Sequence, residues 1–344
     1  MRIALVSDAW APQVNGVVRT LTATVSHLRA LGHRVETVTP DAFRTVACPS
    51  YPEVRLALGA GRVLRARLAA FDPDTIHIAT EGPLGWAARS WCIDQELAFT
   101  TSFHTRFPDY LAVRTHLPAR MFWAPLRRFH AAAARVLVAT GTLEDELRGR
   151  GLDRLHRWSR GVDLSLFHPD GPRLPALDGV PGPIALHVGR LAPEKNIEAF
   201  LSLDTPGTKV VVGHGPARAT LQRRFPEAVF LGALHGEALA AAYRSADVFV
   251  FPSRTDTFGL VMAEAMACGT PVAALSVAGP LDVIGDPRGG ALDDDLGRAI
   301  ERALQLDRAA CAHVGRGFDW AACTRQFLAG LQPVRDRIAS RVPA

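Results

Sequence analysis

The sequence predicts an α/β protein with two domains, each built on a parallel β-sheet with helices on both faces. The chain has 344 residues, more than one ordinary hydrophobic core accommodates. Short apolar runs alternate with helical patterns in both halves, and this alternation is typical of parallel sheets. Between the halves, residues 169–183 contain five prolines and three glycines in fifteen residues, which indicates a linker.

Strands are predicted where short apolar runs recur. In the first half these runs are Ile3–Ser7, Val35–Thr39, Thr75–Ala79, Ala98–Phe103 and Arg135–Ala139, and in the second half they are Ile184–Val188, Lys209–Val212, Val229–Leu231, Val248–Phe251 and Val272–Leu275. The helical patterns include Asn15–Leu31, Glu194–Leu201, Ala217–Phe225, Glu237–Ser245, Leu260–Cys268 and Trp320–Ile338. We expect a first domain over residues 1–168, a second over 169–318 and a C-terminal helix within 319–344.

Bulk composition favours a folded protein without a membrane-spanning helix. Hydrophobic residues make up 48% and charged residues 21% of the chain. No apolar run reaches the roughly 18 residues of a spanning helix, and the N-terminus lacks a signal-peptide pattern, so a cytoplasmic protein is expected. The five cysteines form no Cys-x-x-Cys pair, which argues against a disulfide framework or a cysteine metal site.

Positive charge is concentrated in the first half of the chain. Residues 1–165 contain 21 Arg and 15 Asp or Glu, a net charge of +6, whereas residues 166–344 contain 18 Lys or Arg and 19 Asp or Glu, a net charge of −1. We expect the first half to attract an anionic partner. Nucleic acid is not favoured as that partner, because the basic half lacks interleaved aromatic platforms and a known binding motif.

The segment Val188–Asn196 combines the end of a strand with a glycine and two cations. Gly189 lets the backbone approach a ligand closely, and Arg190 and Lys195 place two positive charges near a predicted helix start. This arrangement suits a dense anion such as a diphosphate. A surface turn with solvated cations is the alternative.

The segment Phe251–Glu264 places two carboxylates on either side of a helix start. A helix is predicted to begin near Gly259, where free N–H groups can bond phosphate oxygens. The spacing between Asp256 and Glu264 lets one carboxylate reach sugar hydroxyls and the other a ribose. In the alternative interpretation, Asp256 caps the helix and Glu264 pairs with an arginine.

In their order along the chain, these motifs resemble family 4 of the retaining glycosyltransferases. Asp256-x7-Glu264 is similar to the family's Glu-x7-Glu pattern, and Ser253–Gly259 resembles the branch with bacterial GDP-mannose-dependent α-mannosyltransferases and sulfoquinovosyl-lipid synthases. The other matching strings are Trp10–Arg19, His77–Gly85, Ser102–Thr105, Arg160–Pro169, Gly189–Lys195 and Gly213–Arg218. The resemblance covers nearly the whole chain. It implies the GT-B fold, in which two Rossmann-like domains face a cleft and the C-terminal helix crosses back to the first domain.

The resemblance also implies roles for individual residues. Arg190 and Lys195 would hold the donor diphosphate as it leaves, Asp256 would bind hydroxyls of the transferred sugar, Glu264 would bind the ribose, and His104 would lie near the reacting centre. The implied catalytic residues are His104, Arg190, Lys195 and Asp256, and the implied donor site is Gly16, Gly189, Arg190, Lys195, Gly213, Asp256, Thr257, Phe258, Gly259, Leu260, Val261 and Glu264.

The implied reaction is retaining hexosyl transfer from a nucleotide-diphosphate sugar to a lipid or glycan. GDP-mannose is the favoured donor. A glycolipid synthase that uses a UDP-sugar (glucose, glucuronate or sulfoquinovose) remains open, because Asp256 is one methylene shorter than the family's usual glutamate. A phosphorylase or epimerase and a non-catalytic nucleotide-sugar-binding protein are further alternatives. No cofactor or divalent metal is expected, since Asp72–Asp74 is interpreted as a turn and Asp293–Asp295 as a helix start.

A basic amphipathic stretch is predicted within Pro118–Arg135. At 100° per residue, four arginines fall within an arc of about 100°, opposite five apolar side chains. The arginines are Arg120, Arg127, Arg128 and Arg135, and the apolar residues are Met121, Phe122, Pro125, Leu126 and Phe129. We assign four residues to an acceptor or membrane side: Glu81, Arg120, Arg127 and Arg128. The basic stretch suits an anionic membrane surface on the cytoplasmic face. An ordinary domain helix with a solvated basic face is the alternative.

Overall fold

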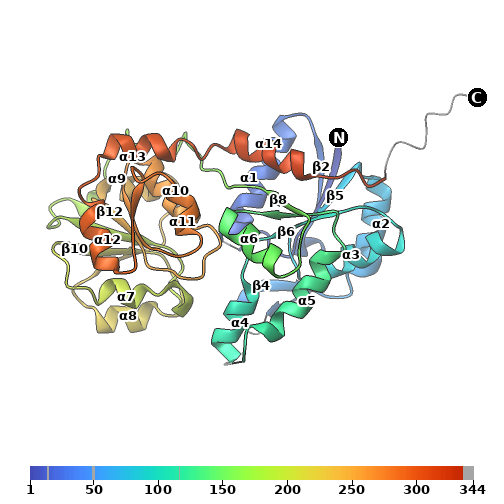
Figure 1. Ribbon diagram of the computed structural model, residues 1–344, viewed down its shortest axis with the longest axis horizontal. Coiled ribbons are helices and arrows are strands. Elements are labelled where there is room, and N and C mark those ends of the chain that lie inside the picture. The colour runs from blue at the N-terminus through green and yellow to red at the C-terminus, as the bar shows by residue number, and fades with distance from the viewer. Residues whose placement is uncertain (14, 49–50, 116, 336–344) are drawn as a thin grey trace, which may run out of the picture. The chain divides into compact units, whose positions relative to one another are not determined.

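The computed structural model describes residues 1–13, 15–48, 51–115 and 117–335, which form two compact units (Figure 1). The first unit contains Met1–Ser159 and the segment that begins at Trp320, and the second contains Arg160–Asp319. The division thus follows Ser159 rather than residue 168. The proline-rich segment packs on the second unit, where Leu177 is 5% exposed and Arg173 donates to the Ser245 carbonyl at 2.7 Å.

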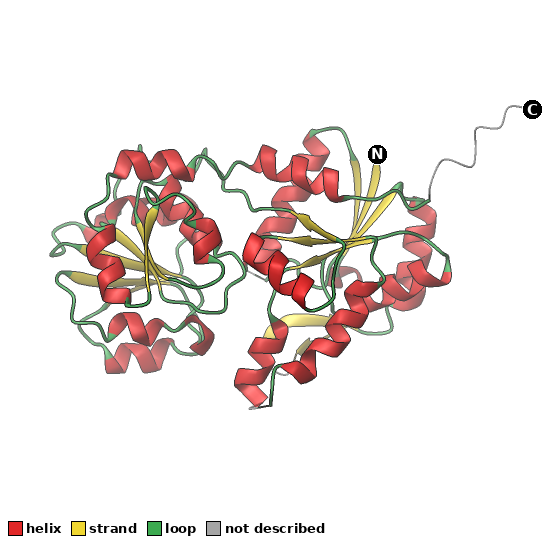
Figure 2. Ribbon diagram, viewed as in Figure 1, coloured by secondary structure: helices red, strands yellow, loops and turns green. Residues whose placement is uncertain are grey.

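The first unit is built on a six-stranded, all-parallel sheet in the order β2-β1-β5-β6-β7-β8. Its strands are β1 (Arg2–Val6), β2 (Arg34–Val38), β5 (Thr75–Ile78), β6 (Thr100–Phe103), β7 (Arg135–Val138) and β8 (Leu155–Arg157). Its helices, red in Figure 2, are α1 (Gly16–Ala30), α2 (Gly61–Phe71), α3 (Pro83–Asp94), α4 (Phe107–Thr115), α5 (Arg120–Ala131), α6 (Gly141–Gly149) and α14 (Trp320–Gly330), with a 3-10 turn η1 (Pro40–Ala42). An antiparallel hairpin of β3 (Thr45–Cys48) and β4 (Tyr51–Ala57) follows β2.

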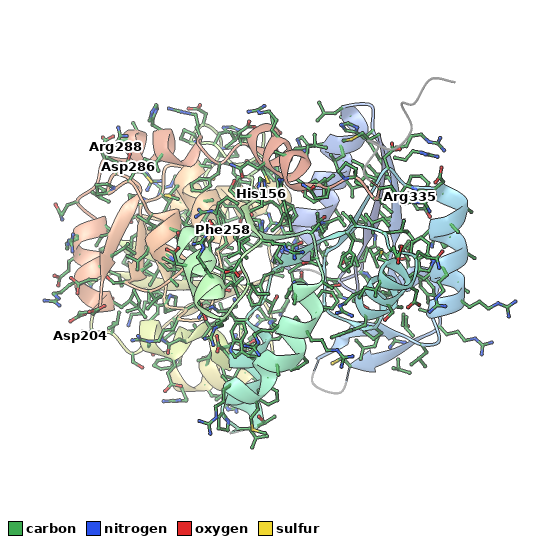
Figure 3. All side chains as sticks on the ribbon, turned by 45° about the vertical axis from the view of Figure 1, so that its right-hand side comes forward. His156, Asp204, Phe258, Asp286, Arg288 and Arg335 are labelled. Atoms are coloured by element: carbon green, nitrogen blue, oxygen red, sulfur yellow. The ribbon has the colours of Figure 1, made fainter. Side chains whose placement is uncertain are left out.

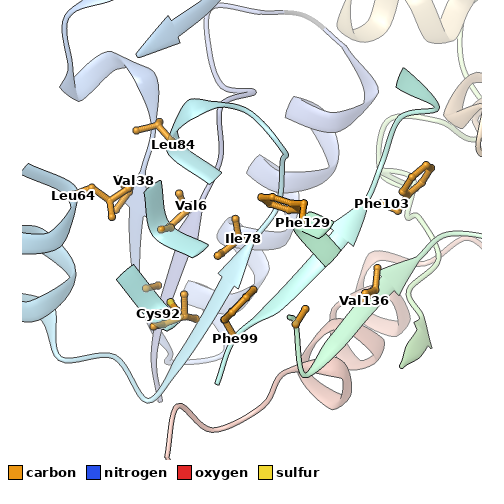
Figure 4. Close-up of a cluster of buried hydrophobic side chains, with 14 of the residues drawn as sticks. Val6, Val38, Leu64, Ile78, Leu84, Cys92, Phe99, Phe103, Phe129 and Val136 are labelled. Carbon is orange, nitrogen blue, oxygen red and sulfur yellow. The ribbon is translucent and has the colours of Figure 1, made fainter. Parts of the chain in front are cut away.

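Two apolar clusters cover the two faces of the first sheet. Successive side chains of a strand point to opposite faces, and β1 accordingly sends Val6 into one cluster and Leu5 into the other. The first cluster contains Leu64, Leu84 and Phe129 of the α2, α3 and α5 helices (Figure 4).

The second cluster joins the sheet to α1 and α14, with Phe327 of α14 fully buried in it. The prediction that the C-terminal helix crosses back to the first domain is therefore confirmed. The helix ends at Gly330 rather than at Ile338, because Leu331 follows in a non-helical turn and Pro333 forms a bridge with Thr75. Residue 338 itself lies outside the described residues.

The second unit is also built on a six-stranded, all-parallel sheet, in the order β11-β10-β9-β12-β13-β14. Its strands are β9 (Ile184–Val188), β10 (Thr208–Val212), β11 (Val229–Gly232), β12 (Val248–Phe251), β13 (Val272–Leu275) and β14 (Gly290–Asp293). Its helices are α7 (Ile197–Leu201), α8 (Arg218–Arg224), α9 (Gly236–Ser245), α10 (Leu260–Ala267), α11 (Pro280–Val283), α12 (Leu296–Ala303) and α13 (Arg308–Gly315), with 3-10 turns η2 (Pro175–Leu177) and η3 (Pro193–Lys195).

The predicted α/β class and its parallel sheets are confirmed, and one predicted helix is wrong. Every residue of β9 and β12 is buried, as expected for strands covered on both faces. The helix expected over Glu194–Leu201 is split into η3 and α7, because Asn196 between them adopts a left-handed conformation with φ 54°. Among the described residues, none of the helices is long and apolar enough to cross a membrane.

Candidate active site

The second sheet brings the predicted anion-binding residues to one place on its carboxyl edge. The chain winds outward from β9 to β11 and then returns to place β12 on the other side of β9, so the strand order reverses between β9 and β12. Ligands of parallel sheets bind at such a switch point. The loop after β9 carries Arg190 and Lys195, and the loop after β12 carries Asp256.

Lys195 and Asp256 form an ion pair across this switch point. The Lys195 Nζ lies 2.5 Å from Asp256 Oδ1, and the two side chains are 20% and 16% exposed. Burial alone would raise the pKa of Asp256, but the Lys195 charge and hydrogen bond, the Ser253 hydroxyl and His187 together hold that pKa below its usual value. The Asn196 amide donates to the Pro252 carbonyl at 3.1 Å and ties the two loops together. Asp256 is therefore ionised at neutral pH.

Arg190 is the more exposed of the two predicted diphosphate-binding cations. Its Nη2 bonds the carboxylate of Glu194, four residues further along; the Arg190 side chain is 35% exposed and that of Glu194 only 7%. Sequence reasoning missed Glu194 as a partner, although its i, i+4 spacing from Arg190 was a signal. Each predicted cation thus has a carboxylate partner, so an anionic ligand would compete with Glu194 and Asp256.

His187 lies beneath these loops and was also missed. It sits in β9 at 2% exposure, and its Nδ1 donates to the Val250 carbonyl at 3.1 Å. Burial and the nearby Lys195 charge lower the pKa of His187 to about 4, so the ring is neutral. Its Nε2 has no hydrogen-bond partner among the described residues, and a Cβ on Gly189 would lie 3.3 Å from it. A histidine in an apolar strand just before Gly189 was the available signal.

Two glycines of the predicted donor site are required by the backbone itself. Gly213 has φ +142°, and a Cβ there would lie 1.8 Å from the Gly189 carbonyl oxygen. Gly259 has φ +83° and is the N-cap of α10, so the prediction of a helix start is confirmed. The N–H groups of Leu260 and Val261 in the first turn have no acceptor within the helix and can serve an anion.

Phe258 and Glu264 point into the protein interior. Phe258, labelled in Figure 3, is 6% exposed and packs edge-on against Phe318 at 6.0 Å. Glu264 is 2% exposed and accepts a hydrogen bond from the Tyr243 hydroxyl at 3.0 Å. The alternative in which Asp256 caps α10 does not hold, because Gly259 occupies that position. A ribose contact for Glu264 stays a prediction.

His104 and Gly16, the other predicted site residues, belong to the first unit. His104 directly follows β6, is 7% exposed, and packs edge-on against Trp158 with ring centroids 5.5 Å apart. Gly16 is the exposed first residue of α1, and the Asn15 side chain caps this helix by accepting from Val18 N–H at 3.0 Å. Their positions at the carboxyl edge of the first sheet fit the predicted roles, which remain predictions.

Glu81 is turned inward rather than toward a surface. Its side chain is 7% exposed, and its Oε1 lies 3.1 Å from Nε2 of the buried His130. The other ring nitrogen of His130 lies 2.9 Å from the Thr101 hydroxyl. An acceptor or membrane contact for Glu81 stays a prediction.

The basic helix is shorter than predicted, and one of its arginines lies elsewhere. Arg120, Arg127 and Arg128 are exposed on α5, but Arg135 is on β7, where it donates to the Ala329 carbonyl at 2.7 Å. The predicted apolar face is wrong in part, since Met121 is 58% exposed. The helix ends at Ala131, and its buried residues are Trp123, Phe129 and His130.

The two Asp-x-Asp strings have the structural roles that were predicted for them. Asp72 ends α2 with φ 46°, and Asp74 accepts from the Arg2 N–H at 2.7 Å just before β5. Asp295 caps α12 by accepting from Gly297 N–H at 2.8 Å. Over the described ranges, the His, Cys, Asp and Glu side chains form no group of three or more that suits a metal ion.

Comparison with known proteins agrees with this architecture. The model for Glycosyltransferase Family 4 matches residues 14–166, and the model for Glycosyl transferases group 1 matches residues 182–306. The chain is 36% identical to a GDP-mannose-dependent alpha-mannosyltransferase of Mycobacterium tuberculosis (strain CDC 1551 / Oshkosh), over 85% of this chain and 83% of that protein. It is 32% identical to sulfoquinovosyl transferase SQD2 of Arabidopsis thaliana, over 95% of this chain and 72% of that protein.

Among solved structures, sucrose-phosphate synthase from Thermosynechococcus elongatus matches with a TM-score of 0.76 at 23% identity, over 95% of this chain and 97% of that one. Two parallel-sheet units of this kind define the GT-B fold. The chain belongs to glycosyltransferase family 4 and is a hexosyltransferase, which confirms the resemblance found in its motifs.

Proposed function

We propose that this enzyme transfers mannose from GDP-mannose to a lipid or glycan acceptor, with retention of configuration at the anomeric carbon. The observation that carries the proposal is the Lys195–Asp256 pair at the switch point between β9 and β12. A donor diphosphate is the kind of ligand that separates such a pair, because it offers Lys195 a denser negative charge than one carboxylate. The names of the mannosyltransferase relatives support the choice of sugar and base.

The proposed reaction breaks the bond between the anomeric carbon and the diphosphate oxygen. The acceptor oxygen bonds the same face of that carbon, and the acceptor proton passes to a diphosphate oxygen. Negative charge grows on the leaving GDP in the transition state, where Arg190, Lys195 and the first amides of α10 would stabilise it most. Asp256, once released from Lys195, would accept hydrogen bonds from hydroxyls of the mannose. Inversion at the anomeric carbon of the product would contradict the proposal.

The donor is tested by thermal-shift screening with GDP, UDP and ADP, followed by labelled GDP-mannose and UDP-hexoses. We expect GDP to raise the unfolding temperature more than UDP or ADP, because at equal concentration the ligand that binds the folded state more tightly stabilises it more. Label should then pass from GDP-mannose to the acceptor. Transfer from UDP-hexoses alone would favour a UDP-sugar-dependent glycolipid synthase, and tight binding without any transfer would favour a non-catalytic nucleotide-sugar-binding protein.

We further propose that the reaction needs no divalent metal, since Arg190 and Lys195 supply positive charge to the leaving group. Activity should persist in excess chelator at its original rate. Complete loss that magnesium restores would reject this part of the proposal while leaving the donor assignment intact.

The exposed side of α5 supports a peripheral contact with an anionic membrane. Arg120, Arg127 and Arg128 are exposed there, and the neighbouring Met121 is 58% exposed. Such a combination suits the headgroup region of an anionic bilayer. Co-sedimentation with phosphatidylglycerol vesicles should fall when all three arginines become glutamine. Unchanged co-sedimentation would reject the membrane contact, whatever the donor is.

A further inference from the structure

A pocket on the first unit lies between α5 and the end of α6, and three of its five lining residues are arginines. Its volume is about 350 Å³, and its lining residues are Arg120, Trp123, Ala124, Arg127 and Arg150. The four α5 residues follow the i, i+3, i+4, i+7 spacing of one helix face. Three arginines thus line one pocket, and the lining residues include no acidic side chain.

Trp123 is the aromatic lining residue of this pocket, and its ring has two close neighbours. The Arg150 guanidinium lies 3.9 Å from the centre of its ring, and Phe103 lies parallel to it at 5.9 Å. Trp123 is 5% exposed, and its Nε1 has no hydrogen-bond partner among the described residues. An indole N–H donates only, so a ligand that satisfies it must bring an acceptor.

The charge of the pocket is only partly balanced within the described structure. Arg150 donates to Glu146 Oε1 at 3.0 Å, and the other oxygen of Glu146 bonds Arg106, which also contacts Asp109 at 3.4 Å. Within the described residues, neither Arg120 nor Arg127 forms an ion pair with a carboxylate. These two cations are therefore available to a ligand.

We propose that this pocket binds a phosphate ester. A phosphate group offers several acceptor oxygens and a charge near −2, which matches guanidinium forks and an indole N–H that have only donors to give. The volume falls within the usual range for small-molecule sites, and so leaves room for the alcohol to which the phosphate is attached. This site lies in the first unit and does not depend on the donor assigned to the second.

The proposal is tested by calorimetric titration with glycerol 3-phosphate and, separately, by binding to phosphatidylcholine vesicles with and without phosphatidylglycerol. Arg127→Gln and Arg150→Gln should each weaken binding at least about tenfold, and Trp123→Phe should weaken it by a smaller factor. Arg128→Gln is the matched control in the calorimetric titration, where no membrane is present: it removes the same charge from the same helix outside the pocket. Lys195→Met is the second control, because it affects only phosphate binding in the second unit.

The two arms of the experiment distinguish the source of the phosphate. Saturable binding of glycerol 3-phosphate that depends on Arg127 assigns the pocket to a soluble ester. Binding that is confined to phosphatidylglycerol vesicles and depends on Trp123 as well as on Arg127 assigns it to a lipid headgroup. Absence of binding in both arms overturns the proposal. So does an equal loss of glycerol 3-phosphate affinity in Arg128→Gln, since that would show general attraction to a basic surface. Because Arg127 is exposed, its variant keeps the test decisive if Arg150→Gln is unstable.

Discussion

The two sheets of this protein use the same edge in different ways. In the first sheet the strand order reverses between β1 and β5, and Asp8 follows β1 at this point. Its carboxylate accepts from the Thr80 hydroxyl at 3.0 Å and from the Leu84 and Gly85 N–H groups at 2.9 and 3.2 Å. Asp8 is 5% exposed, and burial raises its pKa despite these hydrogen bonds.

At the corresponding reversal in the second sheet, the polar groups remain partly accessible. Lys195 and Asp256 pair with each other but keep 20% and 16% of their side chains exposed. At the first switch point, the Asp8 carboxylate accepts hydrogen bonds from the first turn of α3. At the second, Lys195 and Asp256 form an ion pair, and an anionic ligand would compete with Asp256 for Lys195. The strand order makes both edges candidate binding positions, but the residues of their loops differ in exposure and in charge pairing.

The largest effect is expected from Lys195→Met. Removing a preorganised positive group from the leaving diphosphate should lower kcat by about 100- to 1,000-fold. The matched control is Lys209→Met, the other lysine of the chain, whose Nζ donates to the Leu201 carbonyl at 2.8 Å. Steady-state kinetics of both variants with the same donor checks this. If Lys209→Met lost as much kcat while remaining folded, the switch point would have no special status.

A smaller effect is expected from the protonation of His187, which should lower the free energy of unfolding at acid pH. Its pKa is about 4 in the folded protein and 6.5 in an unfolded chain, so protonation below pH 6.5 favours unfolding. This contribution to stability is complete above pH 6.5 and is lost as the pH falls toward 4. The loss amounts to about 3 kcal/mol from a shift of roughly 2.5 pKa units.

Urea unfolding of the wild type and of His187→Asn measures this difference. The asparagine can keep the hydrogen bond to the Val250 carbonyl but does not titrate, so its free energy of unfolding should fall less between pH 6.5 and pH 4. Parallel curves for the two proteins would show that His187 tolerates its charge, contrary to its burial at 2% exposure.

Much of the fold was predictable because buried parallel strands leave a strong local signal. The bounds of β9, β12 and β13 agree with the predicted runs, since each is a short apolar segment between turn residues. The elements that were missed have weaker patterns. The strand Gly290–Asp293 is short and only half apolar, and the split after Lys195 depends on a left-handed Asn196 that no periodicity reveals.

The candidate site was predictable as a set of residues but not as a set of contacts. Sequence reasoning assigned Lys195 to a diphosphate and Asp256 to a sugar, whereas the structure pairs them with each other. That contact depends on β9 and β12 being neighbours, a long-range property of the strand order. Likewise, the contact of Glu81 with His130, 49 positions further along the chain, is invisible in the sequence.

The smallest effect is expected at the first switch point, from Asp8→Ala. The substitution leaves the Thr80 hydroxyl and the Leu84 and Gly85 N–H groups without their acceptor, which should lower the free energy of unfolding by about 1–3 kcal/mol. Asp8→Asn should recover part of this loss, because its amide oxygen can still accept from α3.

The Asp8→Ala variant shows whether Asp8 stabilises the fold or binds a ligand at this edge of the sheet. If Asp8 has only a structural role, urea unfolding will show a lower free energy of unfolding for Asp8→Ala. The affinity of the folded protein for GDP will then stay within about twofold, which corresponds to less than about 0.5 kcal/mol of binding free energy. A large loss of GDP affinity with unchanged stability would mean that Asp8 contributes to a binding site despite its 5% exposure. In that case both sheet edges would bind ligands, and they would differ only in how deeply their polar side chains are buried.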